Sequence, residues 1–137
     1  SIVFSVIFWL VRDHWMAGEY DFEKLESELA MVEDARLEET LQMLDDETLR
    51  QFAQDAEWVA KGRETYQLNC ATCHLSDLTG DIGVNLVDNE WLHGGNPTDI
   101  YNVIVEGVPG TGMQSWSGQL GPKQIAEVVA FVLSKQG

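Results

Sequence analysis

The sequence predicts an all-α protein, and three observations support that class. Apolar residues recur at helical spacing in several segments, little strand pattern is present, and two prolines stand where helices would begin. Expected helices run from about residue 55 up to Cys70, from Pro97 through Val105, and from Pro122 towards the C-terminus. Between the first two of these, the Gly- and Asn-rich stretch Gly80 to Asn96 is expected to be mostly loop.

The first of three expected parts, residues 1–15, is dominated by the apolar run Ile2 to Val11. A membrane-spanning helix needs roughly 20 apolar residues, and this run has about half that number. Trp9 and Trp15 lie where interfacial anchors would, so we interpret the segment as the end of a truncated transmembrane helix. A buried soluble helix is the alternative. The acidic flank that follows favours the non-cytoplasmic side.

The second part, residues 16–54, carries most of the acidity of a chain whose net charge is −15. This charge argues against nucleic acid and anionic lipid headgroups as main partners. Apolar residues recur here at helical spacing and predict amphipathic helices, with Asp45 and Asp46 ending or capping between them. These residues are Phe22, Leu25, Leu29 and Val32, followed by Leu37, Leu41 and Leu44. The stripe must pack on the C-terminal domain, a membrane surface or another protein.

The third part, residues 55–137, contains the chemistry-bearing motif Cys70-Ala71-Thr72-Cys73-His74, which matches the C-x-x-C-H attachment sequence of c-type haem. Two thiols three positions apart on a helical turn can each add to a haem vinyl group. His74 then lies where an imidazole nitrogen can bind the iron. The alternatives are a zinc site, a thioredoxin-like redox pair and a structural disulfide. A zinc site would need further ligands, of which the chain offers few, and a thioredoxin-like pair would need a βαβ pattern, which is absent from the sequence. A disulfide would close a small, strained loop.

The sixth iron ligand predicted from the sequence is Met113, which follows the glycine-containing loop Gly107 to Gly112. A loop-delivered thioether can reach the haem face opposite His74. The main alternative is His93, which would give a bis-His haem or else lie on a surface turn. The other methionines lie in the acidic part and are interpreted as packing residues: Met16, Met31 and Met43.

Trp91 and Trp116 lie on predicted loops near the proposed ligand. Tryptophans in small domains usually serve packing. Here they are also candidates to line the haem pocket or to donate an indole N–H to a haem propionate.

Residues from about Trp58 to Gly137 resemble a class I c-type cytochrome domain, through Gly62 and Tyr66 on the first helix and Phe131 on the last. The resemblance implies that these two helices cross where Gly62 and Phe131 meet. The run from Asn85 to Gly95 is similar to the membrane-anchored haem domains of the dihaem subunit of cbb-type cytochrome c oxidase. Further residues carry that likeness: Pro97, Ile100, Gly107, Met113 and Trp116.

Three positions depart from the family pattern. The chain carries one haem motif where that oxidase subunit has two, and Gln114 replaces the proline that usually follows the ligand methionine. Val84 replaces a proline that helps to place the carbonyl accepting the histidine Nδ1–H bond. We therefore expect a backbone carbonyl near Gly83 or Val84 to take that role.

Together these patterns predict one-electron transfer through a single covalent haem c, by a protein that is not an enzyme on its own. The expected setting is a membrane-tethered subunit of a respiratory or photosynthetic complex, with the haem domain on the periplasmic side, as the resemblance implies. Its partners would be the other subunits and redox proteins with basic docking surfaces. The alternatives are a freely diffusing periplasmic carrier, a peroxidase-like cytochrome, and a structural or assembly subunit with a secondary haem.

Overall fold

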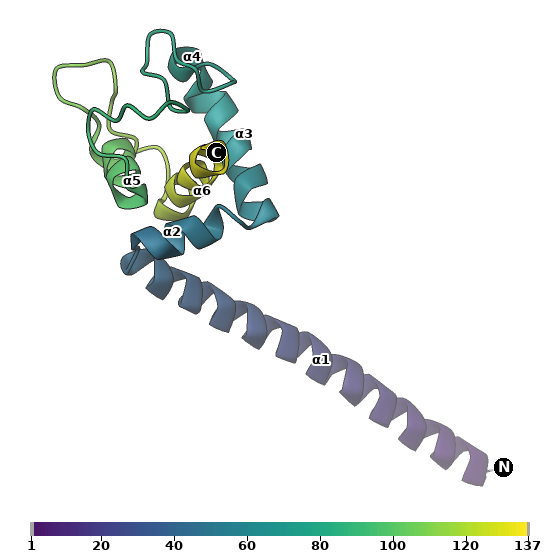
Figure 1. Cartoon of the computed structure of the whole chain (residues 1–137). Helices are drawn as coiled ribbons and strands as arrows, with labels where there is room; N and C mark the ends of the chain where they lie inside the picture. Colours follow the sequence, from purple (N-terminus) through teal and green to yellow (C-terminus); the bar gives the residue numbers. More distant parts are fainter. Residues whose placement is uncertain (1, 137) are drawn as a thin grey trace. The chain divides into compact units, whose positions relative to one another are not determined.

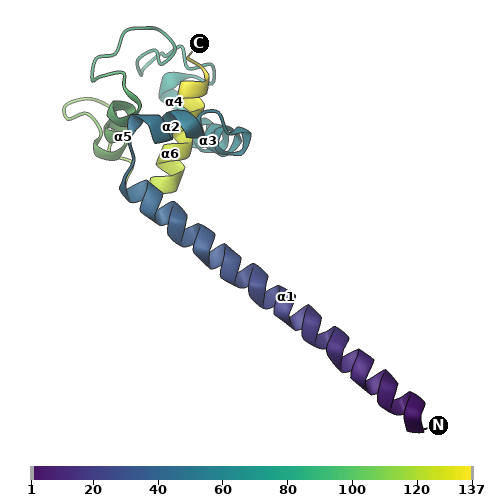
Figure 2. The ribbon, with the colours of Figure 1, turned by 60° about the horizontal axis from the view of Figure 1, so that its bottom comes forward.

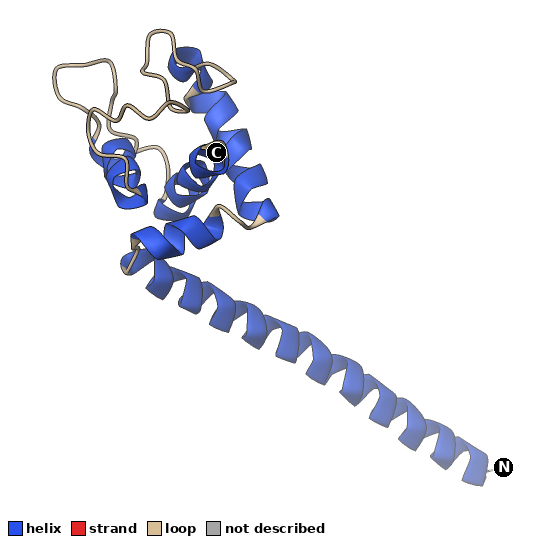
Figure 3. Cartoon of the chain, in the orientation of Figure 1, coloured by secondary structure: helices blue, strands red, loops and turns tan. Residues whose placement is uncertain are grey.

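The structure, a computed structural model, describes residues 2–136, except for the side chains of residues 16–21. Met16 is therefore outside the described side chains. Within residues 2–136 the chain forms helices and loops and no strand (Figure 3), so the predicted all-α class is confirmed. The helices are α1 (Ile2–Gln42), α2 (Asp46–Phe52), α3 (Ala56–Asn69), α4 (Ala71–His74), α5 (Pro97–Glu106) and α6 (Pro122–Ser134) (Figure 1).

The chain divides into two compact units, Ser1–Gln42 and Met43–Gly137. The first unit is α1, a helix of 41 residues that runs through the expected membrane-helix end and on into the acidic part. This continuity is physically simple, because all three prolines of the sequence lie after residue 96 and nothing before Gln42 forces a helix to end. None of the described helices is both long enough and apolar enough to cross a membrane.

The second unit begins with α2, whose start was predicted at Asp45 and Asp46. The Asp45 side chain caps the helix by accepting a 2.8 Å hydrogen bond from the Thr48 backbone N–H. Asp46 in turn accepts from the backbone N–H and the hydroxyl of Thr98, at 2.9 and 2.7 Å, and so joins α2 to the start of α5. Because Leu49 is fully buried, α2 belongs to the core of this unit.

The crossing of α3 with α6 forms the centre of the same unit (Figure 2). A Cβ atom at Gly62 would lie 1.8 Å from the Glu127 carbonyl oxygen and 3.0 Å from the Phe131 Cβ. Only glycine allows the two backbones to approach this closely. The Tyr66 ring packs against Phe131 with centroids 5.2 Å apart. The structure thus has the helix contact that the resemblance implied.

Helices α5 and α6 begin at the two prolines, as predicted. The predicted apolar face of α6 is buried, and its residues are Ile125, Val128, Val129 and Val132. At the start of α5, the Asp99 carboxylate accepts a 3.1 Å hydrogen bond from the Asn96 backbone N–H. Gly94, at φ +92°, makes room for that carboxylate, since a Cβ there would lie 2.5 Å from Asp99 Oδ2.

Candidate haem-binding site

Cys70, Cys73 and His74 lie on one helical turn at the junction of α3 and α4. Cys70 follows the last residue of α3, and its carbonyl accepts hydrogen bonds from the backbone N–H groups of Cys73 and His74, at 3.1 and 3.0 Å. Both cysteines are half-buried free thiols. Among the described side chains no group of three His, Cys, Asp or Glu residues is placed to hold a metal ion.

The imidazole of His74 is oriented by the loop that follows α4. Its Nδ1 lies 2.9 Å from the Val84 carbonyl oxygen. Because a carbonyl can only accept, Nδ1 is the donor in this contact, and in the neutral imidazole the lone pair then lies on Nε2. The predicted carbonyl partner near Gly83 or Val84 is therefore present, and it is that of Val84. A second-shell bond of this kind fixes the tautomer and the ring plane of a metal-binding histidine.

Gly83 lies directly against the His74 ring. A Cβ at Gly83 would be 2.7 Å from both Cε1 and Nδ1 of that ring, so a side chain there would displace the imidazole. The Gly83 N–H donates to the Cys73 carbonyl at 2.8 Å, which holds the loop on the motif helix. The sequence predicted a carbonyl partner for His74 near this position, but not that the ring would need the space left by the missing Gly83 side chain.

The loop is anchored on its other side by Leu78 and Tyr66. Leu78 is 2% exposed, and its carbonyl accepts a 2.8 Å bond from the Leu86 N–H. The Tyr66 hydroxyl donates to the Leu75 carbonyl at 2.8 Å. Burial, with smaller contributions from Cys70 and Asp77, raises the pKa of Tyr66, so its phenol stays protonated and acts as the donor.

Cys70 is a neutral thiol at pH 7 in this structure. Burial, with a smaller contribution from the neighbouring Cys73, raises the pKa of Cys70 to about 11. A thioether bond is also uncharged, so haem attachment at Cys70 would leave no buried charge behind.

Met113 lies on a short loop whose backbone is fixed on both sides of this residue. Its carbonyl accepts a 2.9 Å bond from the Val108 N–H, and a Cβ at Gly107 (φ +69°) would lie 2.8 Å from that carbonyl oxygen. On the far side, the Ser115 hydroxyl donates to the Val105 carbonyl at 2.6 Å. The loop thus has a fixed backbone without the proline that Gln114 replaces, and the Met113 side chain is half-buried.

Trp91 and Trp116 are both half-buried. The Trp91 ring lies over Gly95, where a Cβ would meet its Cδ1 at 2.7 Å. The Trp116 backbone N–H donates to the Ile104 carbonyl at 2.9 Å, next to the bond made by Ser115. Trp116 therefore lies on the Met113 loop, and Trp91 lies on the loop before α5.

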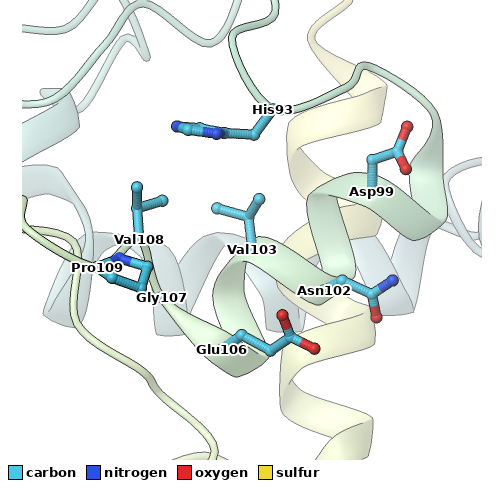
Figure 4. A pocket seen from close by; sticks show the side chains of 8 residues that line it. All are labelled: His93, Asp99, Asn102, Val103, Glu106, Gly107, Val108 and Pro109. Atoms are coloured by element: carbon cyan, nitrogen blue, oxygen red, sulfur yellow. The ribbon is translucent and has the colours of Figure 1, made fainter.

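An open hollow of about 340 Å³ lies between the loop that precedes α5 and α5 itself. The residues that directly follow α5, Gly107 to Pro109, also line it. In Figure 4 the His93 ring lies across it from Val103 and Val108, and the Glu106 carboxylate lies at the far side. His93 is exposed and lies in a turn with Leu92, as the surface-turn alternative expected, and its ring borders the hollow. The valines were not predicted as site residues, although Val103 and Glu106 share a helix face at the spacing of three that adjacent turns require.

The donor set fits a covalently attached haem. Two free thiols share a turn, an imidazole has its Nδ1 against a backbone carbonyl, and a thioether lies on a tethered loop. Thiol, imidazole and thioether groups are those that attach haem c and bind its iron. Glycines at positions 83 and 107 leave the space that the His74 ring and the Met113 backbone occupy.

The arrangement of α3, α6 and the Cys70–His74 turn defines a class I c-type cytochrome domain. A solved structure, cytochrome CL from Methylophaga aminisulfidivorans MPT, superimposes with a TM-score of 0.59, covering 62% of this chain and 57% of that one. The sequence identity to that protein is 22%, so the likeness concerns the fold. The chain belongs to the family described as cytochrome c oxidase, cbb3-type, subunit III, whose model matches residues 57–132.

Curated relatives are likewise described as subunits of cbb3-type cytochrome c oxidases. The chain is 33% identical over 112 residues to the cbb3-type cytochrome c oxidase subunit FixP of Sinorhizobium medicae, a match that covers 75% of this chain and 37% of FixP. It is 38% identical over 88 residues to subunit CcoP of Rubrivivax gelatinosus, covering 63% of this chain and 29% of CcoP. The chain therefore spans about a third of the length of these relatives.

Proposed function

We propose that this chain carries one covalent haem c, bound through Cys70 and Cys73, and that it transfers one electron at a time. His74 and Met113 are the proposed iron ligands. The observation that carries the proposal is the 2.9 Å contact between His74 Nδ1 and the Val84 carbonyl, within a C-x-x-C-H turn. It leaves Nε2 free, which is the condition for the imidazole to bind iron.

Haem iron supplies one-electron exchange between its ferrous and ferric forms. The protein's residues hold and tune it. The Val84 carbonyl orients the imidazole and raises its basicity, and a methionine sulfur raises the reduction potential relative to a second histidine. Trp91 and Trp116 would line the haem pocket, where an indole N–H could donate to a propionate. If His74 and Met113 both held the iron, no position on it would be left for a substrate, so we propose a carrier and not an enzyme on its own.

The setting proposed for this domain is an oxidase complex in a membrane. It is supported by the family membership and by relatives described as subunits of cbb3-type oxidases. We place the haem domain on the periplasmic side and assign the apolar residues 2–11 to the end of a membrane anchor. The net charge of −15 calls for basic docking surfaces on donor, acceptor or neighbouring subunits.

The test is a native gel of source membranes in mild detergent, stained for haem and followed by a denaturing second dimension. A stained chain that travels with a large complex is the expected result. A stained chain alone in the soluble fraction would favour a freely diffusing carrier. A denatured chain without haem stain would overturn the proposal, because thioether-bound haem survives denaturation.

A further inference from the structure

The acidic half of α1 carries an apolar seam, formed by Phe22, Leu25, Leu29 and Val32. Their spacing alternates between three and four residues, which is the repeat of a coiled-coil seam. All four are exposed, with exposed fractions between 50% for Leu25 and 61% for Val32. A helix of this kind obtains most of its stability by packing such a face on a partner.

Charge helps to stabilise α1 only weakly. Among its described side chains, Lys24 and Glu28 form a helical-turn ion pair at 3.9 Å, and both are more than half exposed. The seam therefore needs a covering surface.

The residues that flank the seam specify the chemistry of that surface. Glu26 and Glu33 lie along one side of the seam, and Glu28 lies along the other. In a two-helix coiled coil these are the positions that face the partner's own flanking residues. In a second copy of this chain, parallel or antiparallel, carboxylates would face carboxylates. An anionic membrane surface would repel the same side chains.

We propose that this seam docks an amphipathic helix of a neighbouring protein whose own apolar seam is flanked by Lys or Arg. The proposal rests on the proposed function only in naming that neighbour a subunit of the same complex. It concerns residues before the family match, which begins at residue 57, so the seam is separate from the haem-binding part. Its apolar contacts supply affinity, and its acidic flanks select the partner and exclude self-association.

The probe is a labelled peptide of about four heptads, with Leu along its seam and Lys at the flanking positions. Binding to the purified full chain is followed by fluorescence anisotropy. We expect the Lys-flanked peptide to bind, and peptides with Glu flanks or with Ser along the seam not to bind. The double variant Leu25→Gln/Leu29→Gln should weaken binding by about tenfold or more.

Matched control variants test whether binding depends on the seam itself, or merely on any exposed apolar residue or on the net charge. Met31 is 71% exposed and lies on the opposite face, so Met31→Gln should leave binding unchanged. Glu26→Lys/Glu33→Lys should reject the Lys-flanked peptide and accept the Glu-flanked one. The control Glu23→Lys/Asp34→Lys changes the net charge equally on the far face, and it should not switch the preference.

The peptide measurement needs no haem, so it stands apart from the test of electron transfer. In source membranes, Leu25→Gln/Leu29→Gln should keep its covalent haem but leave the large complex, while Met31→Gln should remain in it. The proposal is overturned if the peptide binds the seam variant as well as the wild type, or does not bind at all. Dimerisation of the chain through the seam at neutral pH would equally overturn it.

Discussion

The His74 imidazole and the Val84 carbonyl, ten residues apart in the sequence, are joined by a hydrogen bond of 2.9 Å. The loop between them passes over the ring so closely that a Cβ at Gly83 would lie 2.7 Å from Nδ1. The backbone of one loop thus determines the tautomer, the ring plane and the space of the proposed iron ligand. The first prediction tests this arrangement.

Replacing Gly83→Ala should push the imidazole away from its position and weaken the bond to iron. Overpacking of this kind lowers the free energy of unfolding by about 1–3 kcal/mol. The visible spectrum of the ferric protein should show loss of the six-coordinate low-spin form, with the covalent haem retained. Gly118→Ala is the control, because a Cβ at Gly118 meets nothing within 4 Å. Equal spectra for the two variants would contradict the assignment of His74.

The second prediction concerns the sixth ligand. Met113→Ala should abolish the weak far-red band that sulfur gives with ferric haem, and should lower the reduction potential. The expected drop is on the order of 0.1 V, within the span of about 0.8 V that axial ligands set. His93→Ala should leave the band and the potential unchanged. The reverse outcome would identify the haem as bis-His, with His93 bound from the hollow beside α5.

Gly62→Ala should be among the most destabilising single substitutions in the chain. Its Cβ would lie 1.8 Å from the Glu127 carbonyl oxygen, so α3 and α6 must separate. We expect a loss of about 3 kcal/mol or more in urea unfolding of the haem-loaded protein. Ala60→Ser, on the exposed side of the same helix, should change stability by no more than about 0.5 kcal/mol. Similar losses for both variants would refute the close contact.

Asp46 should contribute stability that is lost in acid. The backbone N–H and hydroxyl of Thr98 donate to its carboxylate and hold its pKa below the ordinary 3.8. This stabilising contribution is complete above pH 3.8 and disappears as the pH falls through the lowered pKa of Asp46. Asp46→Asn should therefore reduce the melting temperature at pH 7, and the difference from wild type should shrink well below pH 4.

Glu127 should give stability the opposite pH dependence from Asp46. Burial raises its pKa above 4.5, despite the opposing effect of Lys123 and Lys61. Above that value the unfolded chain releases the proton more readily than the folded protein, so stability falls as the pH rises. Glu127→Gln should thus be more resistant to urea than wild type at pH 7, and the gain should vanish near pH 4.5. A variant weaker than wild type at pH 7 would mean that the 3.8 Å ion pair with Lys123 outweighs burial.

Short-range patterns predicted much of the second unit. Pro97 and Pro122 start helices because proline fits the first turn, and Asp45 caps α2 because its carboxylate reaches a free N–H three residues on. The periodic apolar residues of α6 marked its buried face. The length of α1 was harder to predict, because the composition changes from apolar to acidic while the backbone continues without interruption. The membership of α2 in the second unit rests on the burial of Leu49 and on the contact of Asp46 with Thr98, and no local pattern reveals either.

The chemistry of the candidate site was readable along the chain, since two thiols and an imidazole within five residues can serve few purposes. Their spacing is a property of one helical turn and needs no other part of the protein. The placing of the His74 ring is different in kind. It depends on a loop anchored by buried Leu78 and by the Tyr66 hydroxyl, and Tyr66 in turn packs on Phe131 from the far end of the sequence. Contacts between residues so far apart exist only once α3 and α6 have crossed, so the fold alone brings Val84 and Gly83 to the imidazole.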